Sequence, residues 1–305
     1  MKLSIALLLV SLSAFAQTKP RVFYLPRPAQ PEPYRAPMKP LVRLADLEAK
    51  HRGNPNWSEL VILDNNSRAQ VISASPGTKV ARHLHPDAPE WWVVQRGRIR
   101  FEIETEEGKF QSIEATQGSY VYAPERHLHS LEVIGDQPAI RFEVTLSQST
   151  SIWEAPPATN NIPVTLQTGP NPSDVQNPGG VPDRTFYNVG DLAAKHRDQS
   201  AWTETVMRKN RVRGNLICGH TKDNPARKPG DRGHLHADFA EFWIVMKGKL
   251  NWIMEGIDQP LAASEGDIIY APPNRFHAPQ FAGEDLACRL TSSTYPAANH
   301  IYDAK

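Results

Sequence analysis

The chain repeats itself, and this internal repeat constrains its fold more than any other feature of the sequence. Residues 46–52 return as residues 191–197 at an offset of 145 positions, and His83-Leu84-His85 returns as His234-Leu235-His236 at an offset of 151. A third block returns at an offset of 148, with Gly118, Pro124, His129 and Arg141 matched by Gly266, Pro272, His277 and Arg289. Self-similarity of this length predicts two domains of one architecture.

Proline-rich stretches separate the two copies and indicate the domain boundaries. The chain has 305 residues, enough for two domains of ordinary size. We expect a Pro-rich N-terminal arm over 17–40, a first domain over 41–150, a Pro- and Asn-rich linker over 151–185 and a second domain over 186–305. The two extended segments are expected to wrap or bridge the neighbouring domain, with disorder as the alternative.

The first residues have the features of a signal peptide. Lys2 precedes a mostly apolar stretch over 3–12, and Ala14-Phe15-Ala16 supplies a small-x-small cleavage site before Gln17. We therefore expect a signal peptide over residues 1–16 and a mature protein that is secreted or periplasmic. The alternative, a buried N-terminal helix, conflicts with the Pro-rich stretch that follows.

Charge and cysteine content bound the class of partner. The formal net charge of +1 gives no field that would favour nucleic acid or an anionic membrane. After the signal peptide, no segment approaches the roughly 20 apolar residues of a membrane span. A small-molecule substrate is therefore the expected partner, and a homo-oligomer stays open. Cys218 and Cys288 are the only cysteines, and the sequence leaves both a disulfide and two buried thiols open.

Each copy begins with a helical pattern and continues as many short strands. Residues 46–51 and 191–196 have helix-forming composition behind an N-capping Asp. Short runs rich in β-branched and aromatic residues follow, separated by Gly, Pro and Asp, over 90–103, 119–122, 140–145, 242–253 and 267–270. This pattern predicts an all-β fold in which each copy is an antiparallel sandwich or barrel.

Paired histidines in each copy indicate a metal site. Residues two apart on a strand share a face, so His83 and His85 both enter the barrel while Leu84 packs on the other side. Glu90 lies five positions after His85, and the intervening segment 86–89 contains two prolines that break the strand. We therefore expect Glu90 to begin the next strand and to point back inward. Copy two repeats the arrangement with His234, His236 and Glu241.

This spacing resembles the two motifs of the cupin superfamily, written G(x)5HxH(x)3-4E(x)6G and G(x)5PxGxxH. Copy one fits the first motif from Gly77 through His83, His85 and Glu90 to Gly97. The second motif fits Gly118, Pro124 and His129 in copy one and Gly266, Pro272 and His277 in copy two. The resemblance covers residues 44–146 and 189–291, and it implies a bicupin in which each domain is a jelly-roll β-barrel.

Three positions depart from these motifs without replacing a ligand. In copy two, Lys228 holds the place of the leading glycine, and Gly230 follows two residues later. In the second motif, the glycine after the proline is replaced by Arg126 in copy one and by Asn274 in copy two. The eight ligand positions are therefore intact.

The resemblance implies a divalent metal in each domain. The ligands would be His83, His85, Glu90 and His129 in copy one and His234, His236, Glu241 and His277 in copy two. Three neutral imidazoles and one carboxylate suit Mn, Fe, Cu, Ni or Zn and leave coordination positions for water, oxygen or substrate. Ordinary surface or core histidines are the competing explanation, and the occurrence of the full set twice argues against it. His127 is a candidate for an alternative ligand or a proton shuttle, with a surface histidine as the favoured alternative. Copy two has Arg275 at this position, which favours His129 as the ligand.

Recurring aromatic residues and arginines are candidates for the walls of the two sites. A tryptophan two positions after each glutamate shares its face, and it would either bind substrate or belong to the core. A tyrosine ahead of each Ala-Pro is a candidate for acid/base catalysis, with a core tyrosine as the alternative. An arginine in each copy would bind a substrate carboxylate or pair with a neighbouring acid. These pairs are Trp92 and Trp243, Tyr122 and Tyr270, and Arg141 and Arg289.

Cupins with this ligand set have many functions, so the fold alone names no reaction. They include dioxygenases, oxalate decarboxylases and oxidases, isomerases, lyases and non-catalytic binding proteins. Two intact sites in a secreted bicupin resemble the oxalate decarboxylase and quercetin dioxygenase groups most closely. Val80 and Asp231 stand where the decarboxylases carry a substrate-holding arginine, and the glutamate follows the second histidine by five residues rather than four. Both departures weaken oxalate chemistry.

We predict a metal-dependent oxidoreductase, dioxygenase-like or decarboxylase-like, that acts on a small organic or aromatic molecule. In this hypothesis Glu90 and Glu241 are catalytic as metal ligands and as proton acceptors. A redox-inactive lyase or isomerase is the second hypothesis, since the same ligands serve Zn or Ni. A non-catalytic metal- or ligand-binding protein is the third.

Overall fold

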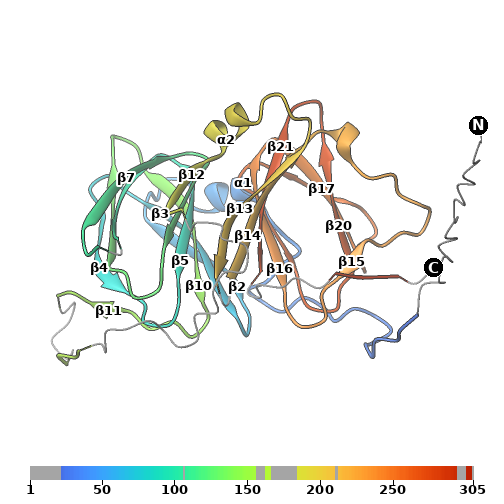
Figure 1. The fold of residues 1–305 in the computed structure, drawn as a ribbon, viewed down its shortest axis with the longest axis horizontal. Helices are drawn as coiled ribbons and strands as arrows, with labels where there is room; N and C mark the ends of the chain where they lie inside the picture. The colour runs from blue at the N-terminus through green and yellow to red at the C-terminus, as the bar shows by residue number, and fades with distance from the viewer. Residues whose placement is uncertain are drawn as a thin grey trace, which may run out of the picture.

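A computed structural model describes residues 22–105, 107–155, 162–165, 184–209, 212–293 and 300–303. Within them the chain forms two β-barrels that lie side by side, each built from a six-stranded and a five-stranded antiparallel sheet (Figure 1). The all-β architecture predicted from the strand pattern is confirmed. The predicted signal peptide, residues 1–16, lies outside the described residues, as does most of the linker.

The N-terminal barrel is made of two facing sheets. The six-stranded sheet has the order β12 (Phe186–Asn188), β8 (Ser119–Ala123), β5 (Glu90–Arg96), β10 (Ala139–Leu146), β3 (Ser67–Ala74) and β2 (Trp57–Leu63). The five-stranded sheet has the order β11 (Ile152–Trp153), β4 (Lys79–Leu84), β9 (His129–Ile134), β6 (Arg98–Glu104) and β7 (Phe110–Thr116).

The C-terminal barrel repeats this strand order. Its six-stranded sheet contains β1 (Leu41–Val42), β19 (Ile268–Ala271), β16 (Glu241–Lys247), β21 (Ala287–Ser293), β14 (Val212–Gly219) and β13 (Trp202–Lys209). Its five-stranded sheet contains β18 (Leu261–Ser264), β17 (Lys249–Met254), β20 (His277–Ala282), β15 (His234–Leu235) and β22 (Ile301–Tyr302). A short 3-10 helix, η1 (Thr221–Asp223), lies in the loop where the second copy is longer.

The burial of two neighbouring strands shows how sequence pattern follows position. Strand β6 alternates buried and more exposed residues, because one of its faces meets the barrel core and the other meets solvent. Strand β5 is buried at its first six residues, since one face lines the barrel interior and the other packs against the second barrel. Its continuous run of apolar and aromatic residues is thus the mark of a strand covered on both sides.

Each predicted helix is present but begins two residues earlier than expected. Helix α1 spans Leu44–Lys50 and helix α2 spans Val189–Lys195, so the expected N-capping aspartates lie inside the first turn. There the carboxylates favour the positive end of the helix. The Asn188 side chain caps α2 by accepting from the Gly190 amide, whereas α1 has no side-chain cap. No described helix is long and apolar enough to cross a membrane.

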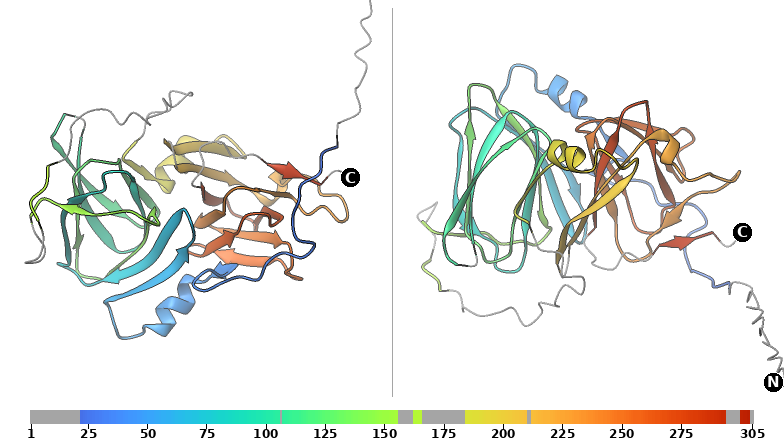
Figure 2. Two further views of the ribbon diagram at one scale, coloured as in Figure 1. Left: turned by 90° about the horizontal axis from the view of Figure 1, so that it is seen from below. Right: turned by 45° about the horizontal axis from the view of Figure 1, so that its top comes forward.

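The barrels exchange edge strands through the segments that precede them. Strand β1 comes before the first copy but pairs with β19 of the C-terminal barrel, and β12 comes before the second copy but pairs with β8 of the N-terminal barrel (Figure 2). The helices follow the same exchange. Leu44 of α1 packs on Gly266, and Val189 of α2 packs on Gly118, where any Cβ on the glycine would clash. The two exchanged strands thus directly follow the predicted arm (17–40) and linker (151–185), at the first residues of the ranges expected for the domains. Most of the linker lies outside the described residues, so its predicted bridging role stays a prediction.

A shared apolar core lies between the two six-stranded sheets. The Trp91 ring is stacked on the Phe242 ring at a centroid distance of 6.2 Å, and Phe142 meets the same phenylalanine edge to face at 6.3 Å. The cluster contains residues of both barrels, so neither six-stranded sheet presents its outer face to water at this point. The two cores inside the barrels are separate from it.

Candidate metal centres

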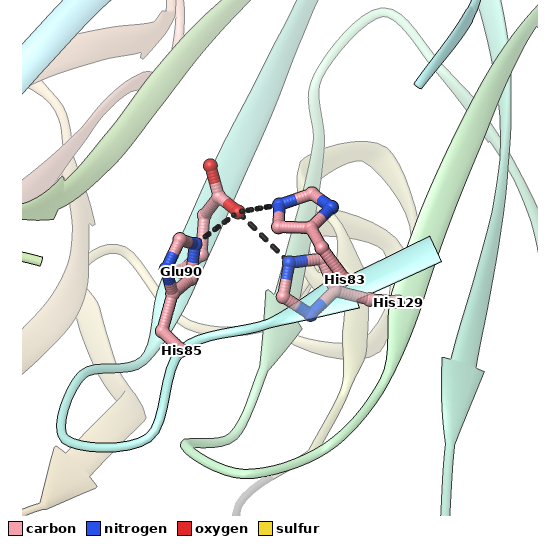
Figure 3. A group of neighbouring side chains, drawn as sticks. All are labelled: His83, His85, Glu90 and His129. Atoms are coloured by element: carbon pink, nitrogen blue, oxygen red, sulfur yellow. Dashed lines mark hydrogen bonds and ion pairs between the residues drawn. The ribbon is translucent and has the colours of Figure 1, made fainter. Parts of the chain in front are cut away.

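Four side chains of the N-terminal barrel converge inside it. His83 lies on β4 and His85 directly follows that strand, while Glu90 begins β5 and His129 begins β9. Their ligand atoms lie within 4.8 Å of one another, and all four residues are buried (Figure 3). Oε2 of Glu90 is 2.9 Å from Nε2 of His129, 3.1 Å from that of His85 and 3.5 Å from that of His83. The residues that the motif spacing indicates are thus brought together.

Backbone carbonyls set which nitrogen of each imidazole faces the centre. In all three histidines Nδ1 is bonded to a carbonyl oxygen at 2.9 to 3.0 Å, so Nε2 is the nitrogen directed at the glutamate. The acceptors for His83, His85 and His129 are the carbonyls of Ala81, Thr150 and His127. His127 therefore orients His129 through its backbone, and its side chain is not one of the four that converge.

Glu90 carries a buried negative charge at the centre of this cluster. Burial alone would raise the pKa of Glu90, but hydrogen bonds with His129, His83 and His85 hold that pKa well below its usual range. Burial also opposes a charge on His85, yet the neighbouring Glu90 carboxylate raises the pKa of His85 above its ordinary value. An anion at this depth, surrounded by imidazole nitrogens, is an electrostatic match for a divalent cation.

The C-terminal barrel has the same four groups, but one imidazole lies further from the glutamate. Oε2 of Glu241 is 3.0 Å from Nε2 of His236 and 3.0 Å from that of His277, but 3.9 Å from that of His234. The His234 Nε2 atom is buried without a hydrogen-bond partner. Burial lowers the pKa of His234, which keeps this imidazole neutral. The three neighbouring imidazoles, of which His236 and His277 are within hydrogen-bond distance, hold the pKa of Glu241 well below its usual range although burial opposes them.

The residues present at both centres fit a divalent transition metal. Each centre offers three imidazole nitrogens and one carboxylate oxygen within coordination reach of a common point. Nδ1 of His277 is bonded to the Arg275 carbonyl at 2.9 Å, which again leaves Nε2 for coordination. The orphaned Nε2 of His234 would gain the partner that it lacks. Each domain therefore carries one metal-binding cluster.

Two residues with left-handed backbone hold the fourth ligand in place. Arg126 and Asn274 stand where the second motif usually has glycine, and they adopt φ values of 66° and 63°. Their amides donate to the carbonyls of His85 at 2.8 Å and of His236 at 2.7 Å. Each bond ties the turn before the fourth ligand to the end of the HxH segment. The motif's conformation is therefore retained without its glycine.

Each metal-binding cluster opens into a cavity within its barrel. The N-terminal cavity has a volume of about 380 Å³ and is lined by Trp92, Arg141 and Trp153 among others. The C-terminal cavity has a volume of about 210 Å³ and is lined by Trp243, Arg289 and His300 among others. The tryptophans and arginines expected at the walls thus lie beside the clusters.

The arginines of the two cavities have different partners. In the N-terminal cavity, Nε of Arg141 donates to Oε2 of Glu143 at 2.9 Å, and the Trp92 indole donates to the same oxygen at 3.1 Å. Thr291 occupies the position of Glu143 in the second copy, and Nε of Arg289 is buried without a hydrogen-bond partner. The expected choice between substrate binding and pairing with an acid is therefore resolved differently in the two barrels.

The two tyrosines predicted as acid/base residues lie away from the metal-binding clusters. Tyr122 and Tyr270 belong to the core between the barrels and line neither cavity. The Tyr270 hydroxyl donates to Asp64 at 2.9 Å, and burial together with that carboxylate raises the pKa of Tyr270. Strand alternation explains the correction. On β8 Val121 and Ala123 face the barrel core, so the intervening Tyr122 points outward.

His300 is a site residue that the sequence argument did not single out. Its ring centroid is 4.3 Å from that of His234 and 5.1 Å from that of His236. Burial and the two neighbouring imidazoles lower the pKa of His300 to about 4, so the ring is neutral at physiological pH. A further repeat would have drawn attention to it, because Ser151-Ile152-Trp153-Glu154 returns as His300-Ile301-Tyr302-Asp303.

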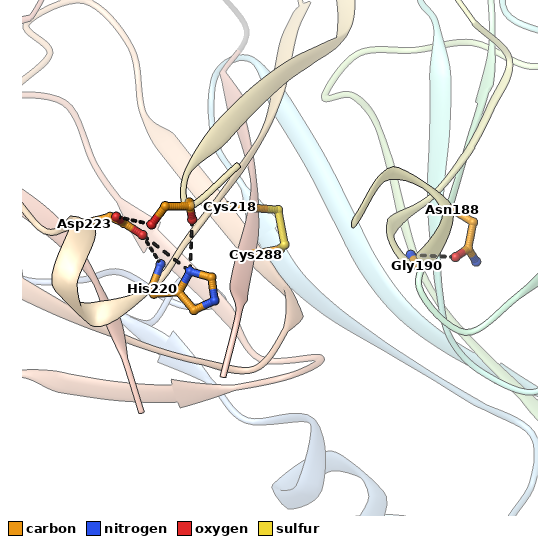
Figure 4. Close-up of a disulfide and its surroundings, with 7 residues drawn as sticks. Asn188, Gly190, Cys218, His220, Asp223 and Cys288 are labelled. Atoms are coloured by element: carbon orange, nitrogen blue, oxygen red, sulfur yellow. Dashed lines mark hydrogen bonds and ion pairs between the residues drawn. A yellow bond between two sulfur atoms is a disulfide. The ribbon is translucent and has the colours of Figure 1, made fainter. Parts of the chain in front are cut away.

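The two cysteines form a disulfide in the C-terminal barrel. Cys218 of β14 faces Cys288 of β21 directly across the ladder, and their sulfurs are bonded (Figure 4). The question that the sequence left open is thus decided in favour of a bridge. At the matching position of the N-terminal barrel Ser73 faces Ile140, so only one barrel has this cross-link.

Comparison with known proteins agrees with this architecture. The sequence model of the cupin domain family matches residues 70–145 and again residues 226–294. No curated protein matches the chain in sequence.

Solved oxalate decarboxylases share the overall fold. One is a variant of oxalate decarboxylase from B. subtilis, which is 14% identical, has a TM-score of 0.52, and aligns over 88% of this chain and 80% of its own. Another is the Lactobacillus farciminis oxalate decarboxylase in a formate complex, which is 16% identical, has a TM-score of 0.51, and aligns over 81% of this chain and 84% of its own. At these identities the likeness concerns the fold alone.

Proposed function

Since this chain is a bicupin with one metal-binding cluster in each domain, we propose that it is a metal-dependent oxidoreductase acting on a small organic or aromatic molecule. The observation that carries this proposal is that each cluster opens into an internal cavity with a tryptophan and an arginine in its wall. Such a cavity encloses a small molecule beside the metal ligands, and a small number of polar side chains in its wall fix the orientation of that molecule. The expected reaction class is dioxygenase-like or decarboxylase-like.

Some residues of each centre would hold the metal, and others would act on the bound substrate. The imidazole Nε2 atoms and one glutamate oxygen would hold the metal, which when bound supplies a Lewis acid and, for Mn, Fe or Cu, a redox centre. Oε1 of Glu90 points away from the three imidazoles (Figure 3), and we assign it as the proton acceptor. The Trp92 and Trp243 indoles exclude water from the bound substrate.

We also propose that the protein works outside the cytoplasm. The support is the Cys218–Cys288 disulfide, which is typical of oxidising compartments, together with the signal-like residues 1–16.

The proposal is tested by metal analysis combined with oxygen uptake. We expect two metal ions per chain, and one per chain in each of His83→Ala and His234→Ala, because each variant removes an imidazole from one cluster only. His127→Ala is the matched control and should retain two, since only its backbone carbonyl supports the cluster.

Oxygen uptake is then screened with small aromatic and aliphatic substrates on the metal-loaded chain. Uptake that stops in the single-metal variants supports the proposal. Conversion without oxygen uptake, without release of carbon dioxide and without a change of redox state would instead assign a lyase or isomerase. A fully loaded chain that converts no substrate would overturn the proposal in favour of a binding protein.

A further inference from the structure

On the paired strands β10 and β3, and on β21 and β14, the walls of the two cavities correspond residue by residue, so their differences there can be compared directly. On β10 and β3, Glu143 faces Gln70 and Thr145 faces Arg68. On β21 and β14, the same ladder positions hold Thr291 facing Asn215 and Ser293 facing Arg213. Each cavity is therefore lined by one arginine on the inner strand and one on the strand beside it. Among these positions, the replacement of Glu143 by Thr291 is the difference that changes the charge of the cavity wall.

In the N-terminal cavity the inner arginine is already neutralised. Arg141 is 5% exposed, and its Nε is 2.9 Å from the Glu143 carboxylate. The same carboxylate oxygen also accepts from the Trp92 indole at 3.1 Å. Glu143 thus occupies the Nε donor of Arg141 and the indole donor of Trp92, and its negative charge repels a ligand carboxylate. This cavity thus contains two arginines, Arg68 and Arg141, and two glutamates, Glu90 and Glu143.

In the C-terminal cavity the corresponding arginine has no acidic partner. No described residue forms an ion pair with Arg289, and its guanidinium lies over the Phe281 ring at 5.2 Å. Nε of Arg289 and Oγ1 of Thr291 are both buried without hydrogen-bond partners. Two unused donors therefore face one small space, and buried donors without partners are costly. The segment between Ser293 and His300 contains no acidic residue that could serve them.

The electrostatics of the C-terminal cavity favour an anion. Arg213 has a neutral partner, because the Asn215 amide oxygen, in its better orientation, accepts from Arg213 at 3.0 and 3.2 Å. The lining thus contains two arginines against a single glutamate, Glu241, which is itself a metal-ligand candidate. Burial lowers the pKa of Arg289 to about 10, which still leaves it positively charged at physiological pH.

We infer that the C-terminal cavity binds a small organic acid whose carboxylate pairs with Arg289 and Thr291, whereas Glu143 closes the N-terminal cavity to such anions. This inference rests on the proposed function, because it names the substrate class of one of its two sites. A planar carboxylate suits the guanidinium fork, and the volume of about 210 Å³ restricts the ligand to a small acid. The Glu143/Thr291 difference is then the specificity determinant between the two barrels.

The test is titration of the zinc-loaded chain with sodium acetate and with neutral acetamide, followed by isothermal calorimetry. We expect one acetate per chain, bound at least about 10-fold more tightly than acetamide, because hydrogen bonds to charged groups account for about 10- to 100-fold in affinity. Arg289→Gln and Thr291→Glu should each weaken acetate binding by that factor. Arg141→Gln is the charge-matched control and should leave acetate affinity within about twofold.

A gain-of-binding variant makes the test independent of the stability of the C-terminal barrel. Glu143→Thr releases Arg141 and should add a second acetate site per chain. The inference is overturned if acetate binds no better than acetamide, if Arg289→Gln and Thr291→Glu both keep wild-type affinity, or if Glu143→Thr adds no site. Metal content and turnover are measured separately, so a chain that binds acetate through Arg289 without turnover would contradict the proposed function alone.

Discussion

The N-terminal barrel and the C-terminal barrel share their ligand geometry and differ in what surrounds it. Both direct three Nε2 atoms at one glutamate oxygen, and both tie the turn before the fourth ligand to the HxH segment. On the neighbouring strands, Ser73 and Ile140 of the N-terminal barrel correspond to the disulfide of the C-terminal barrel, and Glu143 corresponds to Thr291. The difference teaches that the ligand-bearing strands can be kept while charge and cross-linking are altered on the strands beside them. Three changes to the chain would test how far the barrels are independent.

The largest effect is expected from removing the disulfide that only the C-terminal barrel has. Replacing Cys218 and Cys288 together by Ala should lower the free energy of unfolding by about 2–4 kcal/mol, because the bridge closes a loop between residues 70 positions apart. Denaturant unfolding measures the loss. Hydrogen exchange should show it first on β14 and β21.

The matched control installs the same cross-link in the other barrel. Ser73→Cys combined with Ile140→Cys places two thiols at the equivalent facing position of β3 and β10. Equal loss of protection in both barrels after removal of the native bridge would contradict their independence, since the two barrels would then unfold as one unit.

A smaller effect is expected from breaking the ion pair that only the N-terminal barrel has. Glu143→Gln leaves Arg141 buried without a countercharge and removes a full carboxylate acceptor from Trp92, so we expect a loss of about 2 kcal/mol. Thr291→Ala, at the equivalent position, should change stability by less than about 1 kcal/mol. Thermal unfolding of the two variants measures the difference. Equal losses would mean that Glu143 has no special role in its barrel.

The smallest effect is expected where the N-terminal arm is fastened to the C-terminal barrel. Arg27 donates to both oxygens of Glu255 at 2.7 and 2.9 Å, and Arg232 binds the same carboxylate at 2.7 Å. Arg27→Gln should therefore cost about 1–2 kcal/mol, because Arg232 remains. Limited proteolysis should show faster cleavage of the arm.

The pH dependence of this contact has a definite sign. Burial opposes the charge on Glu255, but Arg27, the Phe276 amide and Arg232 together lower its pKa below the unfolded value. The contribution of the Glu255 carboxylate to the free energy of unfolding is complete above the unfolded pKa of about 4.3. It is lost as the pH falls through the lower pKa of the folded state. Glu104 makes the same backbone contact in the N-terminal barrel without an arginine from the arm, so Glu104→Gln is the control. Protection of the arm that is independent of pH from 6 to 3 would contradict this role.

The ligands could be found in the sequence because their pattern is local. The HxH spacing puts two imidazoles on one strand face, and the prolines before Glu90 redirect the chain. The fourth ligand depended on family resemblance, since no local rule connects His129 to His83. Alternation on β5 correctly put Trp92 on the face of Glu90, but Tyr122 on β8 and Tyr270 on β19 were assigned without following that alternation.

The rest depended on contacts between distant segments. No local signal indicates that β1 leaves its own copy to pair with β19, because a two-residue strand has no periodicity. The lack of an acidic partner for Arg289 was equally hidden. Only the register of β14 against β21 shows that Thr291 takes the place of an acid there. The residues of this carboxylate site are brought together by the pairing of strands. In the sequence this pairing is visible only as the offset between the two copies, and no local motif marks it.

The exchanged edge strands also impose an order on synthesis. Arg27 leaves the ribosome long before Glu255, its partner 228 positions later, so the arm must wait without its binding surface while most of the chain is made. During that interval the N-terminal barrel also lacks β12, and its β8 edge stays unpaired until residues 186–188 emerge. Neither barrel can be completed before the other has begun. Each barrel is therefore completed by a strand that precedes the other copy, and cutting the chain between the copies would leave two open sheet edges.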